Sequence, residues 1–264
     1  MGFVNVWLVE RAGRWLVVDT GRPGSVKRLL AGIERAGCSL RDIALIVLSH
    51  AHFDHVGGAA ELRRRSGAPV AIHRLEAPLL REGAFSLSPG LNALGRAEVF
   101  IAKRFVSRSR FEFTPVEPDV LVDDEMRLDS YGFDATVIHS PGHSPGSVSV
   151  FTDGGDLFAG DLAITQPLPG RWRHMPIYGT SIRDIAASWR MLADRGAKRV
   201  YPSHGGDFHV GTHERMRGEQ GQNRGPAFSP LFRTCGVKRG GNERPTPNVS
   251  CNYQIGRASC RERV

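Results

Sequence analysis

The sequence is poor in cysteine and contains no long apolar run. Only four of its 264 residues are cysteines, and none of them forms a C-x-x-C pair, so no disulfide framework is predicted. No apolar segment approaches the roughly 20 residues of a membrane-spanning helix. The first residues lack the basic region and small-residue cleavage site of a signal peptide. We therefore expect a cytoplasmic location and no membrane partner. With 41% hydrophobic and 23% charged residues, the composition also excludes a wholly disordered chain.

Acidic residues are scarce only near the carboxyl end. The whole chain has a formal charge of +8, with 35 Lys and Arg against 27 Asp and Glu. Residues 215–264 hold ten Lys and Arg against three Asp and Glu, so they carry +7 and the first 214 residues carry +1. A strongly basic chain would indicate a nucleic-acid partner. Here the basic character belongs to the tail, and the nearly neutral remainder does not favour such a partner.

The tail also differs in its sequence pattern. Residues 211–264 are rich in Gly, Pro, Asn and Arg and show no sustained helical or strand period, so we predict a basic, disordered extension. Its last ten residues, IGRASCRERV, resemble the translation of a common short-read sequencing adapter. On this interpretation at least residues 255–264 are an artefact, and the native sequence ends between about 210 and 254.

Residues 1–210 read as one domain in which strands and helices alternate. Apolar, β-branched runs predict strands at residues 3–10, 15–18, 43–48, 69–72, 126–128, 133–138, 147–151, 157–159 and 199–201. Helical spacing of apolar residues predicts helices at 25–35, 57–65, 75–81 and 182–192. Residues 76–118 show weaker periodicity and are interpreted as an insertion on the substrate side. The pattern indicates an α/β protein built on sheets.

Four potential metal ligands follow the apolar strand 43–48. In His50-x-His52-x-Asp54-His55, alternation along an extended segment would point the first three side chains the same way, and a following turn can bring in His55. Imidazoles with a carboxylate suit zinc or another first-row divalent ion. Burying such a cluster without a function would be costly. Five isolated histidines are instead expected at the surface or in hydrogen-bonded core positions: His73, His139, His174, His209 and His213.

Three further candidates occur in the same local setting. His143 in SPGHSPG, Asp161 in FAGD and His204 in PSHGG each follow a predicted strand and lie beside glycine or a turn. Ligand sites in open sheets form at the carboxyl ends of strands. The chain thus offers seven converging side chains, enough for two ions: His50, His52, Asp54, His55, His143, Asp161 and His204.

The motifs as a set resemble those of metallo-β-lactamase-fold hydrolases. The matching segments are residues 4–20 with the turn Asp19-Thr20-Gly21, and the motifs HAHFDH, PGHSPGS, AGD and PSHG. They occur in the family's order and span residues 4–206. The resemblance implies an αββα sandwich. It also implies that His50, His52 and His143 hold one ion, that Asp54, His55 and His204 hold a second, and that Asp161 bridges both. Zn²⁺ is the favoured ion, with Fe or Mn as alternatives, and Asp19 would orient the site.

The resemblance further implies a dinuclear hydrolase. A metal-bridging hydroxide would attack an ester, lactone or thioester carbonyl of a small molecule, and Asp54 and Asp161 would be catalytic. Ser49 and Ser203 adjoin ligands, but loop-shaping is favoured over a nucleophilic role. Asp161 argues against a true β-lactamase and favours the branch of glyoxalase II and the lactonases. The lactonase pattern places a tyrosine where this chain has Ile164. The tail has no pattern for the helical domain of glyoxalase II.

Two other functions remain open at this point. Relatives with the same metal chemistry cleave phosphodiesters as nucleases, although the low charge of residues 1–214 offers little attraction for nucleic acid. A metal-binding protein without turnover is the second alternative. The sequence specifies neither the substrate nor the oligomeric state.

Overall fold

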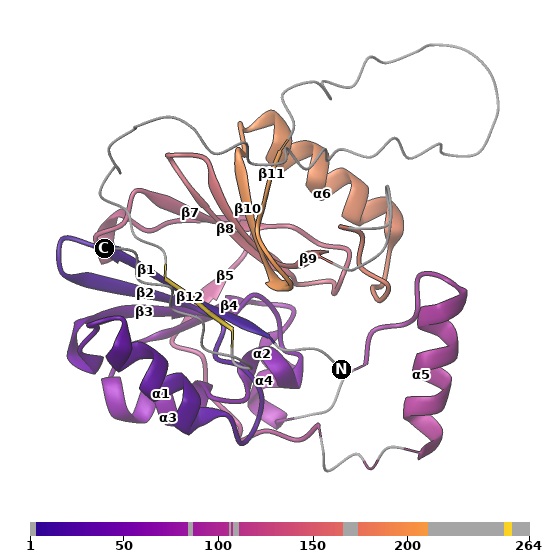
Figure 1. Cartoon of the computed structure of the whole chain (residues 1–264), viewed down its shortest axis with the longest axis horizontal. Coiled ribbons are helices and arrows are strands. Elements are labelled where there is room, and N and C mark those ends of the chain that lie inside the picture. The colour runs from indigo at the N-terminus through magenta and orange to yellow at the C-terminus, as the bar shows by residue number, and fades with distance from the viewer. Residues whose placement is uncertain are drawn as a thin grey trace, which may run out of the picture.

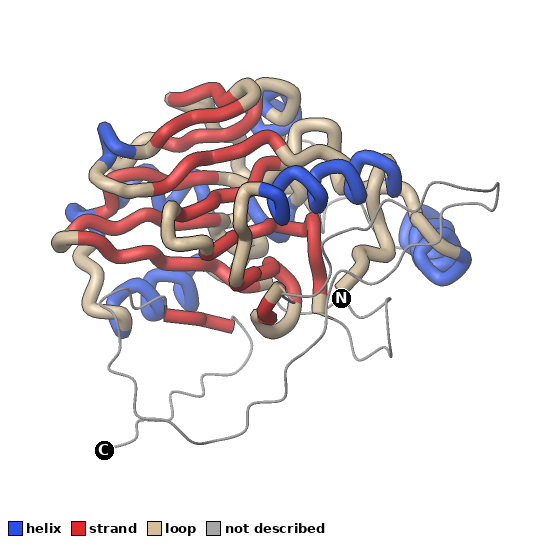
Figure 2. Tube along the Cα trace, turned by 90° about the horizontal axis from the view of Figure 1, so that it is seen from above, coloured by secondary structure: helices blue, strands red, loops and turns tan. Residues whose placement is uncertain are grey.

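Two facing sheets form the centre of the molecule (Figures 1 and 2). The computed structural model describes residues 4–83, 87–105, 107, 111–165 and 174–210, and the backbone of 251–254. The first six-stranded sheet has the order β12-β1-β2-β3-β4-β5. Its strands are β1 (Asn5–Arg11), β2 (Arg14–Val18), β3 (Ile43–Val47), β4 (Val70–His73), β5 (Val120–Val122) and β12 (Cys251–Gln254). Pairing is antiparallel for β12-β1-β2 and parallel from β2 to β5.

The second sheet also has six strands, in the order β11-β10-β9-β8-β7-β6. They are β6 (Glu125–Arg127), β7 (Ala135–His139), β8 (Val148–Thr152), β9 (Asp156–Ile164), β10 (Arg199–His204) and β11 (Phe208–His209). All neighbours pair antiparallel except β9 and β10, which run parallel because α6 (Ile182–Asp194) lies between them in sequence. Ser181 caps this helix, its Oγ accepting from the backbone N–H of Asp184 at 3.2 Å.

Helices cover the outer face of each sheet. α1 (Val26–Arg35) and α3 (Ala59–Ser66) lie against the first sheet, and α6 lies against the second (Figure 1). The shorter elements are α2 (Phe53–Val56), α4 (Ala77–Glu82), α5 (Ala93–Phe105) and the 3₁₀ turns Leu40–Asp42 and Asp129–Tyr131. The αββα sandwich that the sequence predicts is thereby confirmed.

Three apolar layers hold the sandwich together. Between the sheets pack large side chains such as Trp7, Leu45 and Phe158. An outer layer joins the first sheet to α1 and α3, and a second joins the other sheet to α6 through Trp189 and Leu192. The strands β3 and β4 are buried on both faces, which explains why their sequences are continuous apolar runs.

The structure corrects three local expectations. The segment after β3 is not extended as far as Asp54, because α2 begins at Phe53, and the helix expected over 57–65 begins only at Ala59. The strand expected at 157–159 is longer: β9 continues to Ile164, past an irregular pairing with β10 around Gly160.

The predicted insertion, residues 76–118, contains α4 and α5. The sequence did not predict α5, which stands beside the sandwich (Figure 1) and exposes apolar side chains such as Leu94, Ile101 and Phe105. In the described part of the chain, no helix has both the length and the apolar character that crossing a bilayer requires. Of the predicted tail, β12 is described and pairs with β1, whereas His213 and residues 255–264 lie outside the described residues.

Candidate metal centre

The seven predicted side chains meet at one edge of the sandwich, from both sheets. His50 and His52 follow β3 and come from the first sheet. His143 lies between β7 and β8, and the remaining second-sheet contributions are Asp161 in β9 and His204 at the end of β10. Asp54 and His55 lie on α2, which turns them toward the same point.

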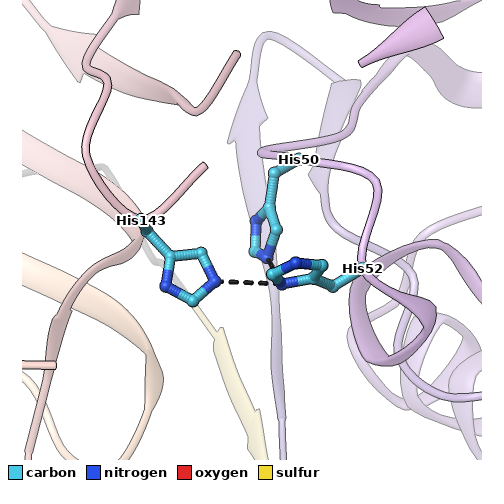
Figure 3. Close-up of side chains that lie close together, drawn as sticks. All are labelled: His50, His52 and His143. Carbon is cyan, nitrogen blue, oxygen red and sulfur yellow. Dashed lines mark hydrogen bonds between the residues drawn. The ribbon is translucent and has the colours of Figure 1, made fainter. Parts of the chain in front are cut away.

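Three histidine rings converge with their nitrogens facing one another (Figure 3). His52 Nδ1 lies 2.9 Å from His50 Nε2 and 3.0 Å from His143 Nε2. All three side chains are buried. One ring nitrogen from each of three histidines, gathered at a single point, is a donor set that a first-row divalent ion prefers.

The other ring nitrogen of each histidine has its own partner. These contacts hold the rings in place and leave the converging nitrogens free for a ligand. They join His50 Nδ1 to Ser49 Oγ (3.0 Å), His52 Nε2 to Ser88 Oγ (3.4 Å), His143 Nδ1 to the Tyr178 carbonyl (3.1 Å) and His55 Nδ1 to Asp19 Oδ2 (2.8 Å).

A second group lies beside the three histidines. Asp54, His55 and His204 each offer one atom within 4.8 Å of the others, which is close enough to share an ion. Asp161 lies between the groups: its Oδ1 is 3.5 Å from His55 Nε2, and its Oδ2 is 3.4 Å from His204 Nε2 and 3.6 Å from His143 Nε2.

Two atoms of this cluster are buried and lack a hydrogen-bond partner. They are His55 Nε2 and Asp161 Oδ1. A buried polar atom without a partner is energetically costly. Both atoms point into the interior of the cluster, so a group bound there would have to offset this cost. A cation between an imidazole nitrogen and a carboxylate oxygen does this, so the residues present fit a metal ion.

The charge states of His50, His52 and Asp161 suit metal ligands. Burial and the neighbouring imidazoles lower the pKa of His50 and His52 well below the usual histidine range, which keeps both rings neutral. Burial opposes ionisation of Asp161, yet His204, His55 and His143 outweigh it and hold the pKa of Asp161 well below its usual value. Neutral imidazoles and an ionised carboxylate are the forms that bind metals. Burial opposes protonation of His55 and His204, but Asp161 outweighs it and raises the pKa of both rings, so these two must lose a proton to bind an ion.

Asp19 fixes the back of the site. It is buried with a left-handed backbone (φ 63°), and its Oδ1 accepts from the Ser49 backbone N–H at 2.8 Å. Its Oδ2 accepts from the hydroxyls of Ser49 and Ser203 at 2.9 and 3.0 Å, in addition to the His55 ring. Both serine hydroxyls therefore donate to a carboxylate, which fits the loop-shaping role better than that of a nucleophile.

The structure brings in residues that the sequence analysis did not single out. Ser88 and Glu76 both lie against the ligand loops. A signal for Glu76 was present, since an acidic residue within the apolar stretch Leu75–Leu80 must find polar partners when buried. The backbone carbonyl of Tyr178 contacts the His143 ring, and the Tyr178 hydroxyl donates to Glu98 on α5.

Gly160 lets β9 approach the ligand loop. Its φ is +55°, and a Cβ there would lie 2.8 Å from Ser49 Cβ. We therefore expect Gly160→Ala to lower the free energy of unfolding by about 1–3 kcal/mol and to weaken metal binding, because Asp161 is the next residue. Gly24→Ala is the matched control: it has φ +78° but nothing within 4 Å, so it isolates backbone strain from the contact. Urea unfolding and metal titration measure both effects; equal losses in the two variants would contradict the expectation.

The chain is similar to known proteins. A family model described as the metallo-beta-lactamase superfamily matches residues 1–204. The chain is 28% identical over 191 residues to MJ0888 of Methanocaldococcus jannaschii, a probable metallo-hydrolase, covering 72% of this chain and 82% of that protein. It is 31% identical over 218 residues to the human acyl-coenzyme A thioesterase MBLAC2, covering 77% of this chain and 74% of the human one.

The chain is also similar to solved structures. TTHA1623, crystallised in a di-iron-bound form, matches with 29% identity and a TM-score of 0.54 over 77% of this chain and 88% of its own. The Rm3 metallo-beta-lactamase matches with 25% identity and a TM-score of 0.56 over 77% and 73%. Because the family model spans most of the chain and the His/Asp cluster lies where the sheets meet, the chain belongs to the metallo-beta-lactamase superfamily and is a metal-dependent hydrolase.

Proposed function

We propose that the chain hydrolyses a thioester, or a related ester or lactone, with two divalent metal ions held by the seven clustered side chains. The observation that carries this proposal is the convergence of three imidazole nitrogens beside a second group, with buried Asp161 Oδ1 and His55 Nε2 unpartnered between the two. One ion alone would leave part of this donor set unused.

The ligands divide between the ions as follows. His50, His52 and His143 form the tri-histidine group and would hold the first ion. Asp54, His55 and His204 would hold the second. Asp161 would serve both, because its two oxygens face histidines of both groups. Zinc suits this mixture of imidazole and carboxylate, and iron is the alternative, supported by the di-iron form of TTHA1623.

When bound, such ions supply Lewis acidity and make water available as a nucleophile near neutral pH. The side chain of Asp54 is 20% exposed, which leaves its carboxylate accessible from outside the cluster. It is therefore placed to accept the proton of the attacking water and to return it to the leaving group. In a thioester the new carbon–oxygen bond replaces the carbon–sulfur bond, and that proton leaves with the thiolate as a thiol.

The substrate class rests on the relatives and on the site together. MBLAC2, at 31% identity, is an acyl-coenzyme A thioesterase, and this similarity supports a thioester. Asp161 supports the same choice over a β-lactam, as the sequence resemblance implies. A phosphodiester is the second candidate, because the same metal chemistry acts on phosphorus.

A substrate panel tests the proposal. The metal-loaded chain is offered an acyl-coenzyme A, an S-acylglutathione, a lactone, a cephalosporin and bis-p-nitrophenyl phosphate. We expect kcat/KM for the preferred thioester to exceed that for the phosphodiester by about 100-fold or more. Turnover of the phosphodiester or the cephalosporin alone would overturn the assignment. A metal-loaded chain inactive toward all five would instead indicate a non-catalytic metal-binding protein.

A further inference from the structure

Glu76 is a buried carboxylate outside the seven proposed ligands. Its exposed fraction is 2%, and it lies directly before α4, at the start of the insertion. Its Oε2 accepts from the backbone N–H of Ala51 at 2.9 Å, and its Oε1 accepts from the backbone N–H of Gly146 at 3.0 Å. The two carboxylate oxygens therefore serve two different backbone donors.

The two donors belong to two metal-ligand loops. Ala51 stands between His50 and His52 in the loop after β3, which is part of the first sheet. Gly146 lies three residues after His143 in the loop between β7 and β8, in the second sheet. One side chain therefore connects the ligand loops of the two sheets, just where His52 and His143 face each other at 3.0 Å.

The fit around this carboxylate is tight. A Cβ at Gly146 would lie 2.7 Å from Glu76 Cγ and 2.9 Å from His73 Nδ1. The loop can approach Glu76 this closely only because residue 146 is a glycine. His73 is itself buried and stacks on His139 of β7 at a ring distance of 4.1 Å. Glu76 therefore has little freedom to shift if one of its hydrogen bonds is removed.

From this geometry we infer that Glu76 is a positioning residue for the tri-histidine group: it sets the distance between the His50–His52 loop and the His143 loop. The inference rests on the proposed two-metal site and makes it more specific. None of the contacts described for Glu76 reaches Asp54, His55 or His204, so its loss should weaken one ion and spare the other.

Glu76→Gln tests this role. The amide keeps the size of the side chain but replaces one acceptor oxygen with an NH₂ group, which cannot accept from a backbone N–H. We expect the dissociation constant of the tri-histidine ion to rise about 10- to 100-fold, the usual effect of removing a contact that orients ligands. The affinity of the second ion should change less than about threefold, within ordinary context effects.

The measurement is a zinc titration against a chromophoric chelator, which needs no turnover. His143→Ala and His204→Ala assign each binding step to its ion. Asp119→Asn is the matched control, because Asp119 also accepts from a backbone N–H, that of Val70 at 2.9 Å, but lies away from the ligand loops. It should leave both steps unchanged. Glu76→Asp, which is too short to reach both donors, provides a second variant if Glu76→Gln folds poorly.

The outcomes separate this inference from the proposed function. Selective weakening of the step that His143→Ala also removes supports the positioning role. Equal weakening of both steps, as expected of general destabilisation, would overturn it, as would wild-type affinity in both Glu76 variants. If the wild-type chain itself binds no zinc, the two-metal proposal fails rather than the role of Glu76.

Discussion

Replacing Asp161 by alanine is expected to remove one or both metal ions and to lower kcat/KM by at least about 10³-fold. The side chain faces His143 and His204 through Oδ2 and His55 through Oδ1, at 3.4 to 3.6 Å. Among the described residues, Asp161 is the carboxylate that groups with both His50 and His55, and Asp54 is the other carboxylate among the seven proposed ligands. The variant would therefore keep half of the carboxylate charge that balances two cations. We expect it to lose more metal affinity and activity than a variant of a residue that only orients ligands.

Metal analysis and kinetics measure this effect together. The purified wild-type chain should contain close to two zinc or similar ions per molecule, and the Asp161→Ala variant one or none. Asp153→Ala is the control, because Asp153 is an exposed partner of Arg127 beyond the end of β8 and should affect neither quantity. An Asp161→Ala variant that keeps two ions and normal turnover would refute the bridging role. A folded wild-type chain that takes up no metal would refute the metal site as a whole.

The sequence predicted which side chains converge better than it predicted their surroundings. His50 lies three residues after β3, and His204 is the last residue of β10. Open sheets place ligands at the carboxyl ends of strands, and this rule can be applied from the order of strand patterns in the sequence alone. Asp54 reaches the cluster by another route. The turn that was expected to bring in His55 begins earlier, at Phe53, as the helix α2. This helix places both Asp54 and His55 in the cluster. Asp161 is inside a strand, and an irregular pairing at Gly160 rather than a strand end turns it inward.

What the sequence could not predict depends on contacts between distant segments. Glu76 is 25 residues from Ala51 and 70 from Gly146, and Ser88 is 55 residues from His143. Such partners leave no period in the sequence, because each contact forms only when the fold brings distant segments together. The same holds for α5: Gly95, one of its few buried positions, lies against the carbonyl of Ile177, about eighty residues later in the chain.

Replacing Asp19 by asparagine is expected to lower the free energy of unfolding by about 3 kcal/mol. Its carboxylate accepts from Ser49, Ser203 and His55, and all of these contacts are buried. An amide presents only one oxygen, so at least one buried donor loses its partner whichever way the amide is turned. Asparagine tolerates the left-handed backbone at this position as well as aspartate does, so strain adds nothing to the loss.

Urea unfolding of the metal-free and the zinc-saturated chain measures this effect. Ser203→Ala removes a single donor to the same carboxylate and should cost only about 0.5–1.5 kcal/mol. Asp19 contacts His55, a ligand of the second ion, directly and reaches His50 only through Ser49, whereas Glu76 connects the loops of the tri-histidine group. Asp19→Asn should therefore weaken the ion held by Asp54, His55 and His204 more than the tri-histidine ion, the reverse of Glu76→Gln. An Asp19→Asn variant with wild-type stability, or one that weakens the same ion as Glu76→Gln, would contradict this division of the site into two separately supported halves.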